Sequence, residues 1–129
     1  MDMTQALDSL RADLPGCSLV AFTDLSSNLV LCLSAAAKPA QEEVDRLSAM
    51  ASVVLDGSVA EGAAPVLQSG EGDSRAGTAM LLTERDAKVF LRQGGDAPEA
   101  LICICAPDID LRKVVDCGRA TLDGIVSQT

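Results

Sequence analysis

The chain has 129 residues, a length that suits one domain of ordinary size with a core of its own. Its net charge of −9 and the lack of a concentrated basic stretch argue against nucleic acid as a ligand, because phosphate-rich partners need a basic surface. Aromatic residues are limited to Phe22 and Phe90, so the side chains that commonly stack bases or anchor compact interfaces are scarce.

The first expected element is an amphipathic helix over residues 2–14, whose apolar stripe consists of Met3, Leu7, Leu10 and Leu14. Pro15-Gly16 ends it. Two β-prone runs follow, CSLVAFTD (17–24) and LVLCLSA (29–35), and the polar break between them predicts an antiparallel hairpin. Because these runs are apolar on both faces, we expect helices to cover both sides of the sheet.

A second helix is expected to begin at Lys38-Pro39, since proline suits the first turn of a helix. It ends near Asp56-Gly57, and its apolar stripe consists of Val44, Leu47, Met50, Ala51 and Val54. Small residues run beside this stripe: Ser48, Ala49 and Ser52. A stripe this broad predicts that one face packs on the sheet while another lets a second helix approach closely.

Residues 57–76 are rich in Gly, Ala, Ser and Glu, which predicts a flexible linker or one short element around Val66-Leu67. Three strands at 78–84, 87–93 and 99–106 then read as a meander. A final helix is expected over about 109–127, with Asp108 or Asp110 as its N-cap. The order α-β-β-α-β-β-β-α predicts an α/β fold of profilin-like type, a five-stranded antiparallel sheet sandwiched by helices.

The sequence shows no catalytic, cofactor or metal signature. It has no histidine, which removes the usual acid–base group and the commonest metal ligand. Cys103 and Cys105 would share one face of a strand, and Cys17 or Cys32 could join them, but the spacing lacks the paired, turn-borne cysteines of zinc sites; we interpret these residues as core fillers. The SGEGDS stretch (69–74) lacks the lysine of a phosphate loop. We therefore expect a protein that is not an enzyme, with no metal and no cofactor.

Five cysteines form an odd set without a CxxC pair, which is typical of reduced thiols. The acidic, amphipathic N-terminus differs from a signal peptide, and no apolar run approaches the roughly 18 residues that span a bilayer. The expected location is the cytoplasm, without contact with a membrane.

This order of elements resembles the roadblock family of dynein light chains and its bacterial relatives, and the likeness covers almost the whole chain. Its most specific stretch is TAMLLTERDAKVFLRQGGDAPEALICICAPDIDLRKVVDCGRATLDGI. There the family's small and aliphatic strand corresponds to Ala100–Ala106, its Asp-containing break to Pro107-Asp108, and the basic start of its last helix to Arg112-Lys113. Two features depart from the family: the hairpin turn has no glycine, and segment 57–76 is longer than usual.

The resemblance implies a homodimeric, non-enzymatic module. Roadblock proteins dimerise through the central helix and the third strand, and the resulting platform binds small GTPases or larger scaffolds. Carried over by position, the dimer interface would consist of Val44, Leu47, Ser48, Ala51, Ser52, Val54, Thr78, Met80 and Leu82. The alternative, from another class, is a small-ligand sensor domain of PAS/GAF-like type, which usually displays a polar-lined cavity with aromatic residues.

Overall fold

The computed structural model describes residues 3–27, 29–56, 77–92 and 98–127, without the side chains of Val54, Asp56 and Ser127. The expected linker at 57–76 lies outside the described residues. The helices are α1 (Met3–Asp13), α2 (Gln41–Asp56) and α4 (Leu111–Ser127). The strands are β1 (Cys17–Asp24), β2 (Leu29–Ala35), β3 (Thr78–Leu82), β4 (Ala87–Leu91) and β5 (Glu99–Cys105).

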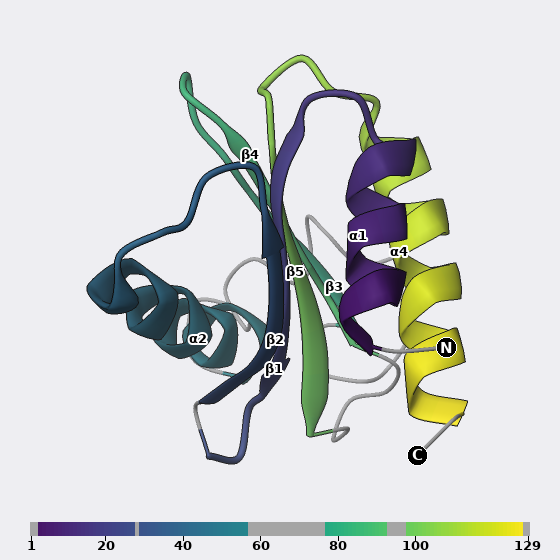
Figure 1. Cartoon of the computed structure of the whole chain (residues 1–129). Helices are drawn as coiled ribbons and strands as arrows, with labels where there is room; N and C mark the ends of the chain where they lie inside the picture. The colour runs from purple at the N-terminus through teal and green to yellow at the C-terminus, as the bar shows by residue number, and fades with distance from the viewer. Residues whose placement is uncertain (1–2, 28, 57–76, 93–97, 128–129) are drawn as a thin grey trace.

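The five described strands form one antiparallel sheet in the order β2-β1-β5-β4-β3. Helix α2 lies on one face of this sheet, and α1 and α4 lie side by side on the other (Figure 1). The predicted fold class and order of elements are confirmed. Strands β2 and β3 occupy the two edges of the described sheet.

The sheet separates two cores, because successive side chains of a strand point to opposite faces. On β1, Val20 and Phe22 join the core under α1 and α4, whereas Leu19 and Ala21 join the core under α2. The leucine stripe of α1 belongs to the first core, where Leu7 and Leu10 are almost completely buried. Both faces of the sheet are covered, as the apolar strands predicted.

The expectation of full cover is wrong for β2. Leu29 and Leu31 are 58% and 52% exposed, although the run from Leu29 to Leu33 is apolar throughout. The reason is its position: β2 pairs only with β1 in the described sheet, and the pairing is irregular between Phe22 and Thr23. An edge strand with a shifted register cannot turn all of its side chains toward a covering helix.

None of the described helices combines the length and apolar character that crossing a bilayer requires.

Candidate protein-interaction surface

The inner face of α2 holds most of the helix residues expected in a dimer interface. Leu47 is 3% exposed, and Ser48 and Ala51 are completely buried against the chain's own sheet. Val44, at 9% exposure, lies at the border of that contact. These side chains are therefore used within the monomer, because the sheet already occupies the space in front of them.

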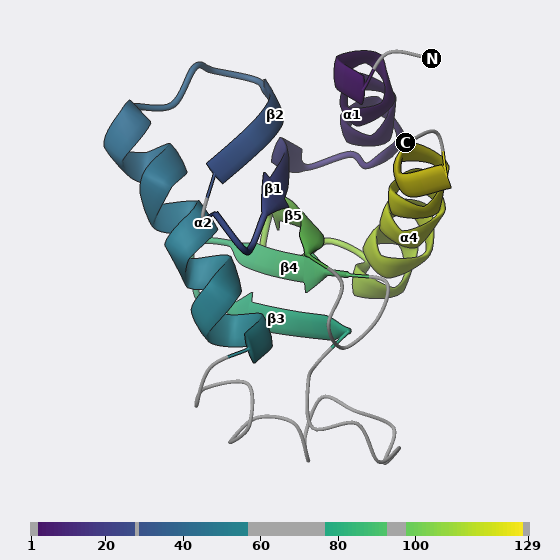
Figure 2. The ribbon, with the colours of Figure 1, turned by 90° about the horizontal axis from the view of Figure 1, so that it is seen from below.

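The outer face of α2 is formed by other residues. Ala49 is exposed, Met50 is partly buried, and Val53 keeps 49% of its surface exposed. Toward the N-terminus of the helix this face becomes charged, with Glu42, Asp45 and Arg46 all exposed. Helix α2 ends beside β3 (Figure 2). The second half of the helix thus carries a small, apolar surface.

Position 53 was missed by the sequence reasoning, which assigned the apolar positions of this helix to a single stripe. The signal was present: Arg46, Ala49 and Val53 follow one another at helical spacing on the side opposite the stripe. A valine on a helix face that otherwise carries charged residues and an alanine is the feature that distinguishes this side.

Strand β3 presents its residues to both sides of the sheet. Thr78, Met80 and Leu82 alternate with Ala79 and Leu81, and Met80 packs against the core under α1 and α4. Ala79 and Leu81 belong to the core under α2. The strand residues expected in the interface therefore point to the face opposite α2, and they do not form one continuous surface with Leu47 or Ser48.

Helix α2 ends beside β3, which is an edge strand of the described sheet. The outer backbone of β3 has no partner strand among the described residues, and Leu82 at its end is 60% exposed. Ser52, also expected in the interface, is partly buried, and its hydroxyl lies 3.5 Å from the carbonyl oxygen of Leu25. We use the name α2–β3 surface for Ala49, Met50, Val53 and the outer edge of β3.

The start of β3 is held from the opposite face by an arginine of α4. The Arg119 guanidinium donates to the carbonyl oxygens of Arg92, at 3.1 Å, and Gly77, at 2.9 Å, and it also donates to the Thr78 hydroxyl. Arg92 is itself buried and donates to the carbonyl oxygen of Leu55, at the last turn of α2, at 3.0 Å. These contacts join both helices to the β3 end of the sheet, which gives the edge a defined position.

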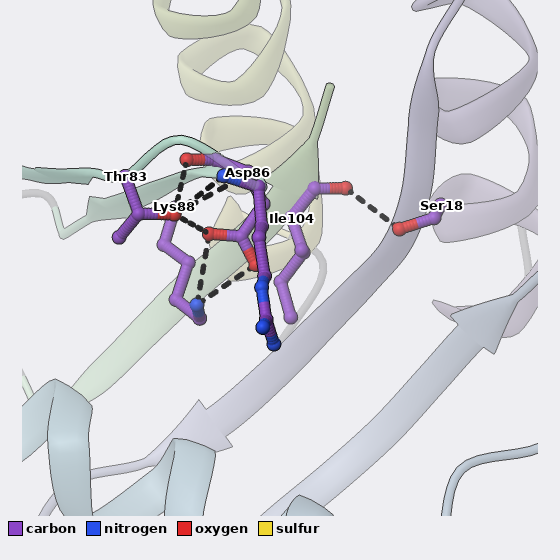
Figure 3. Close-up of polar contacts among 6 residues, drawn as sticks. Ser18, Thr83, Asp86, Lys88 and Ile104 are labelled. Atoms are coloured by element: carbon purple, nitrogen blue, oxygen red, sulfur yellow. Dashed lines mark hydrogen bonds and ion pairs between the residues drawn. The ribbon is translucent and has the colours of Figure 1, made fainter. Parts of the chain in front are cut away.

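A groove of about 570 Å³ lies at the opposite end of α2, between its N-terminus and the β3–β4 turn. Its lining includes Leu19 and Ile104 from the sheet, Lys38 and Glu43 from the start of α2, and Arg85 and Asp86 from the turn. Figure 3 shows how this turn is held: Asp86 forms an ion pair with Lys88 at 3.0 Å, and the Thr83 hydroxyl accepts the backbone amide of Asp86. Neither phenylalanine lines the groove, since both are buried in the two cores.

The cysteines lie where the sequence placed them, on the strands and the last helix. Cys17, Cys103 and Cys105 join the core under α1 and α4, while Cys32 and Cys117 are partly buried at its margin, and all five are free thiols. Among the described residues, no group of three or more histidine, cysteine or acidic side chains is arranged to hold a metal ion.

No protein-family model and no curated protein sequence matches the chain. Solved structures do match it. A roadblock/LC7 domain from Streptomyces avermitilis superposes with a TM-score of 0.76 at 12% identity, covering 99% of this chain and 98% of that one. MglB from Myxococcus xanthus superposes with a TM-score of 0.72 at 14% identity, covering 97% and 92%.

The gliding protein MglB from Thermus thermophilus gives a TM-score of 0.70 at 17% identity, covering 98% of this chain and 90% of that one. An MglB structure described in a tetrameric arrangement is similar to the same degree, with a TM-score of 0.72. At these identities the likeness concerns the fold. The resemblance seen in the sequence is thereby confirmed at that level: the chain has the fold of the roadblock/LC7 domain.

Proposed function

We propose that the protein is a homodimeric adaptor or regulatory module that acts in the cytoplasm by binding partner proteins, without catalysing a reaction. The observation that supports this most directly is the α2–β3 surface. It combines an exposed apolar helix face with the outer edge of a strand, and both features favour association with a protein. The partner class that the roadblock resemblance suggests is a small GTPase or a larger scaffold.

In the proposed dimer, the β3 edges of two copies pair, and the outer faces of the two α2 helices meet beside them. This arrangement gives the outer backbone groups of β3 hydrogen-bond partners. It also buries Val53, while Ala49 is small enough for two helices to approach closely. The positions proposed for helix contact are therefore Ala49, Met50 and Val53, rather than the buried Leu47 and Ser48.

The groove beside the start of α2 is the feature that bears on the alternative, a small-ligand sensor. Its lining is open and lacks aromatic side chains, and one of its two acidic residues, Asp86, is engaged by Lys88. Ligand pockets are usually enclosed and lined by apolar and aromatic side chains. We therefore favour protein binding over small-ligand sensing.

Sedimentation equilibrium of the full chain tests the dimer. We expect a dimer at micromolar concentration, and we expect Ala49→Arg and Val53→Arg each to give a folded monomer with an unchanged circular dichroism spectrum. Ala120→Arg, at an exposed alanine of α4 on the other face, is the matched control and should stay dimeric. A monomeric unmodified protein would contradict the proposal, and a dimer that survives both α2 substitutions would exclude the helix contact.

Titration calorimetry tests the partner class. The dimer is mixed with a Ras-like small GTPase of the same organism, loaded either with GDP or with a non-hydrolysable GTP analogue. We expect binding that depends on the nucleotide and weakens in the Val53→Arg variant. If the dimer binds neither form of any such GTPase, the partner belongs to the scaffold class.

A further inference from the structure

Two thiols face each other where β1 begins and β5 ends. Cys17 and Cys105 are register partners across the antiparallel β1–β5 pair. Both side chains belong to the core under α1 and α4, so they project to the same face of the sheet. The Cys17 thiol donates to the carbonyl oxygen of Leu19 at 3.5 Å.

The backbone around this pair brings the side chains close together. The amide of Cys17 donates to the carbonyl oxygen of Leu14, and the amide of Ala106 donates to that of Gly16. The register of the two strands shifts between Cys17 and Leu19, and Cys17 still has Cys105 as its Cα partner on the far side of that irregularity. Opposite residues of an antiparallel pair have Cα atoms about 4.5–5.5 Å apart, which falls within the about 4.4–6.8 Å that disulfides span.

We propose that Cys17 and Cys105 are a site of reversible oxidation, at which a hydroperoxide converts the two thiols into an intramolecular disulfide. Of the three cysteines in this core, Cys17 is the most exposed, at 8%, against 2% for Cys105 and 0% for Cys103. A small oxidant therefore reaches Cys17 first. The product would link β1 to β5 at this end of the sheet.

The two sulfurs have different roles in the reaction. The neighbouring Cys105 side chain, assisted by the positive charge of Arg11, lowers the pKa of the Cys17 thiol, whereas the Cys17 side chain and burial raise the pKa of Cys105. Because the thiolate is the reactive form, Cys17 is the sulfur that attacks the hydroperoxide. Cys105 keeps its proton until the second step.

In the first step the Cys17 thiolate bonds to one peroxide oxygen, the O–O bond breaks, and the other oxygen leaves and takes up a proton, which gives a sulfenic acid. In the second step the Cys105 sulfur attacks the Cys17 sulfur, the S–O bond breaks, and water leaves with the proton of Cys105. The sulfurs lose two electrons, and the peroxide is reduced to an alcohol and water. With hydrogen peroxide both products are water.

The neighbouring thiol of Cys103 is less well placed to form a disulfide. Cys103 has Val20 as its register partner on β1. It lies two residues from Cys105 on the same strand, a separation of about 6.6 Å at the usual rise per residue, with its Cβ bond parallel to that of Cys105. Complete burial also raises the pKa of the Cys103 thiol. Cys103 is therefore the internal control for the proposed pair.

The test treats the reduced full chain with hydrogen peroxide, blocks the remaining thiols with N-ethylmaleimide, and maps the disulfide by peptide mass spectrometry. We expect a linked pair of peptides containing Cys17 and Cys105, the loss of two of the five thiols, and their return after dithiothreitol. The Cys103→Ala variant should form the same link. The variants Cys17→Ala and Cys105→Ala should retain their remaining thiols under the same exposure.

The peptide map of the unmodified protein decides the proposal even where a variant folds poorly. A link between Cys17 and Cys103, a link between chains through Cys32 or Cys117, or sulfinic acid at Cys17 without any link would each overturn it. A full set of free thiols after an exposure that oxidises free glutathione would overturn it as well.

Discussion

The hydroxyl of Ser48 on α2 lies 2.9 Å from the hydroxyl of Thr23 on β1, and both side chains are completely buried. The Thr23 hydroxyl donates its proton to the carbonyl oxygen of Leu29 at 2.8 Å. Ser48 must therefore be the donor to Thr23, because a hydroxyl has a single proton to give. This chain of hydrogen bonds connects the helix, the central part of the sheet and the edge strand β2.

Replacement of Ser48 by alanine should lower the free energy of unfolding by about 1 kcal/mol, since Thr23 keeps its own acceptor and loses only one donor. Ser48→Arg should prevent folding, because the side chain would place an unpaired charge in the core under α2. Urea denaturation measures both. Ser9→Ala, at an exposed serine of α1, is the control and should change stability by less than about 0.5 kcal/mol. A fully stable Ser48→Arg protein would show that this residue faces solvent.

Arg119→Lys should destabilise the protein by about 1–3 kcal/mol. The Arg119 guanidinium donates to the carbonyl oxygens of Arg92 and Gly77 at the same time. The ammonium group of the shorter lysine side chain cannot form both hydrogen bonds. Arg112→Lys, on an exposed side chain of the same helix, serves as the control and should be neutral. Equal midpoints of thermal unfolding for the two variants would contradict the role assigned to Arg119.

Two glycines of α4 should respond to alanine in opposite directions. A Cβ atom at Gly118 would lie 2.5 Å from the Cδ1 atom of Leu91, which is buried, so Gly118→Ala should cost about 1–3 kcal/mol through overpacking. A Cβ atom at Gly124 would meet nothing within 4 Å, so Gly124→Ala should gain up to about 1 kcal/mol from helix propensity. Thermal denaturation of the pair checks the packing of α4; a shift of the same sign in both would show that α4 packs differently.

Asp110→Ala should lower stability by about 1 kcal/mol, whereas Asp108→Ala should have little effect. The Asp110 carboxylate accepts the backbone amides of Arg112 at 3.1 Å and Lys113 at 3.3 Å, which is the geometry of a helix N-cap. Asp108 is exposed before the helix begins. Chemical denaturation of the two variants decides between them, and a larger loss for Asp108→Ala would reverse the assignment.

Local patterns in the sequence were sufficient to predict the elements and their order. The leucine spacing of α1, the β-prone runs of β1 and β5, and the proline before α2 act over a few residues, so each can be recognised without knowing its neighbours. The same is true of Cys103 and Cys105, whose spacing alone placed them on one face of a strand. The sequence left two aspartates, Asp108 and Asp110, as candidates for the N-cap of α4. Only the hydrogen bonds of the structure identify Asp110 as the cap.

Only the tertiary structure determined which side of each helix or strand faces the core and which side faces solvent. Ser48 is a small polar residue, and from the sequence we expected it to face a partner helix. In the structure it lies on the inner face of α2, where its hydroxyl forms a hydrogen bond with the Thr23 hydroxyl. Leu31 has the same chemistry as the buried leucines and is exposed because β2 lies at the sheet edge. The pairing of Cys17 with Cys105 likewise depends on strand register, which joins residues far apart in the chain. Burial and pairing of this kind arise from long-range packing, and no local pattern specifies them.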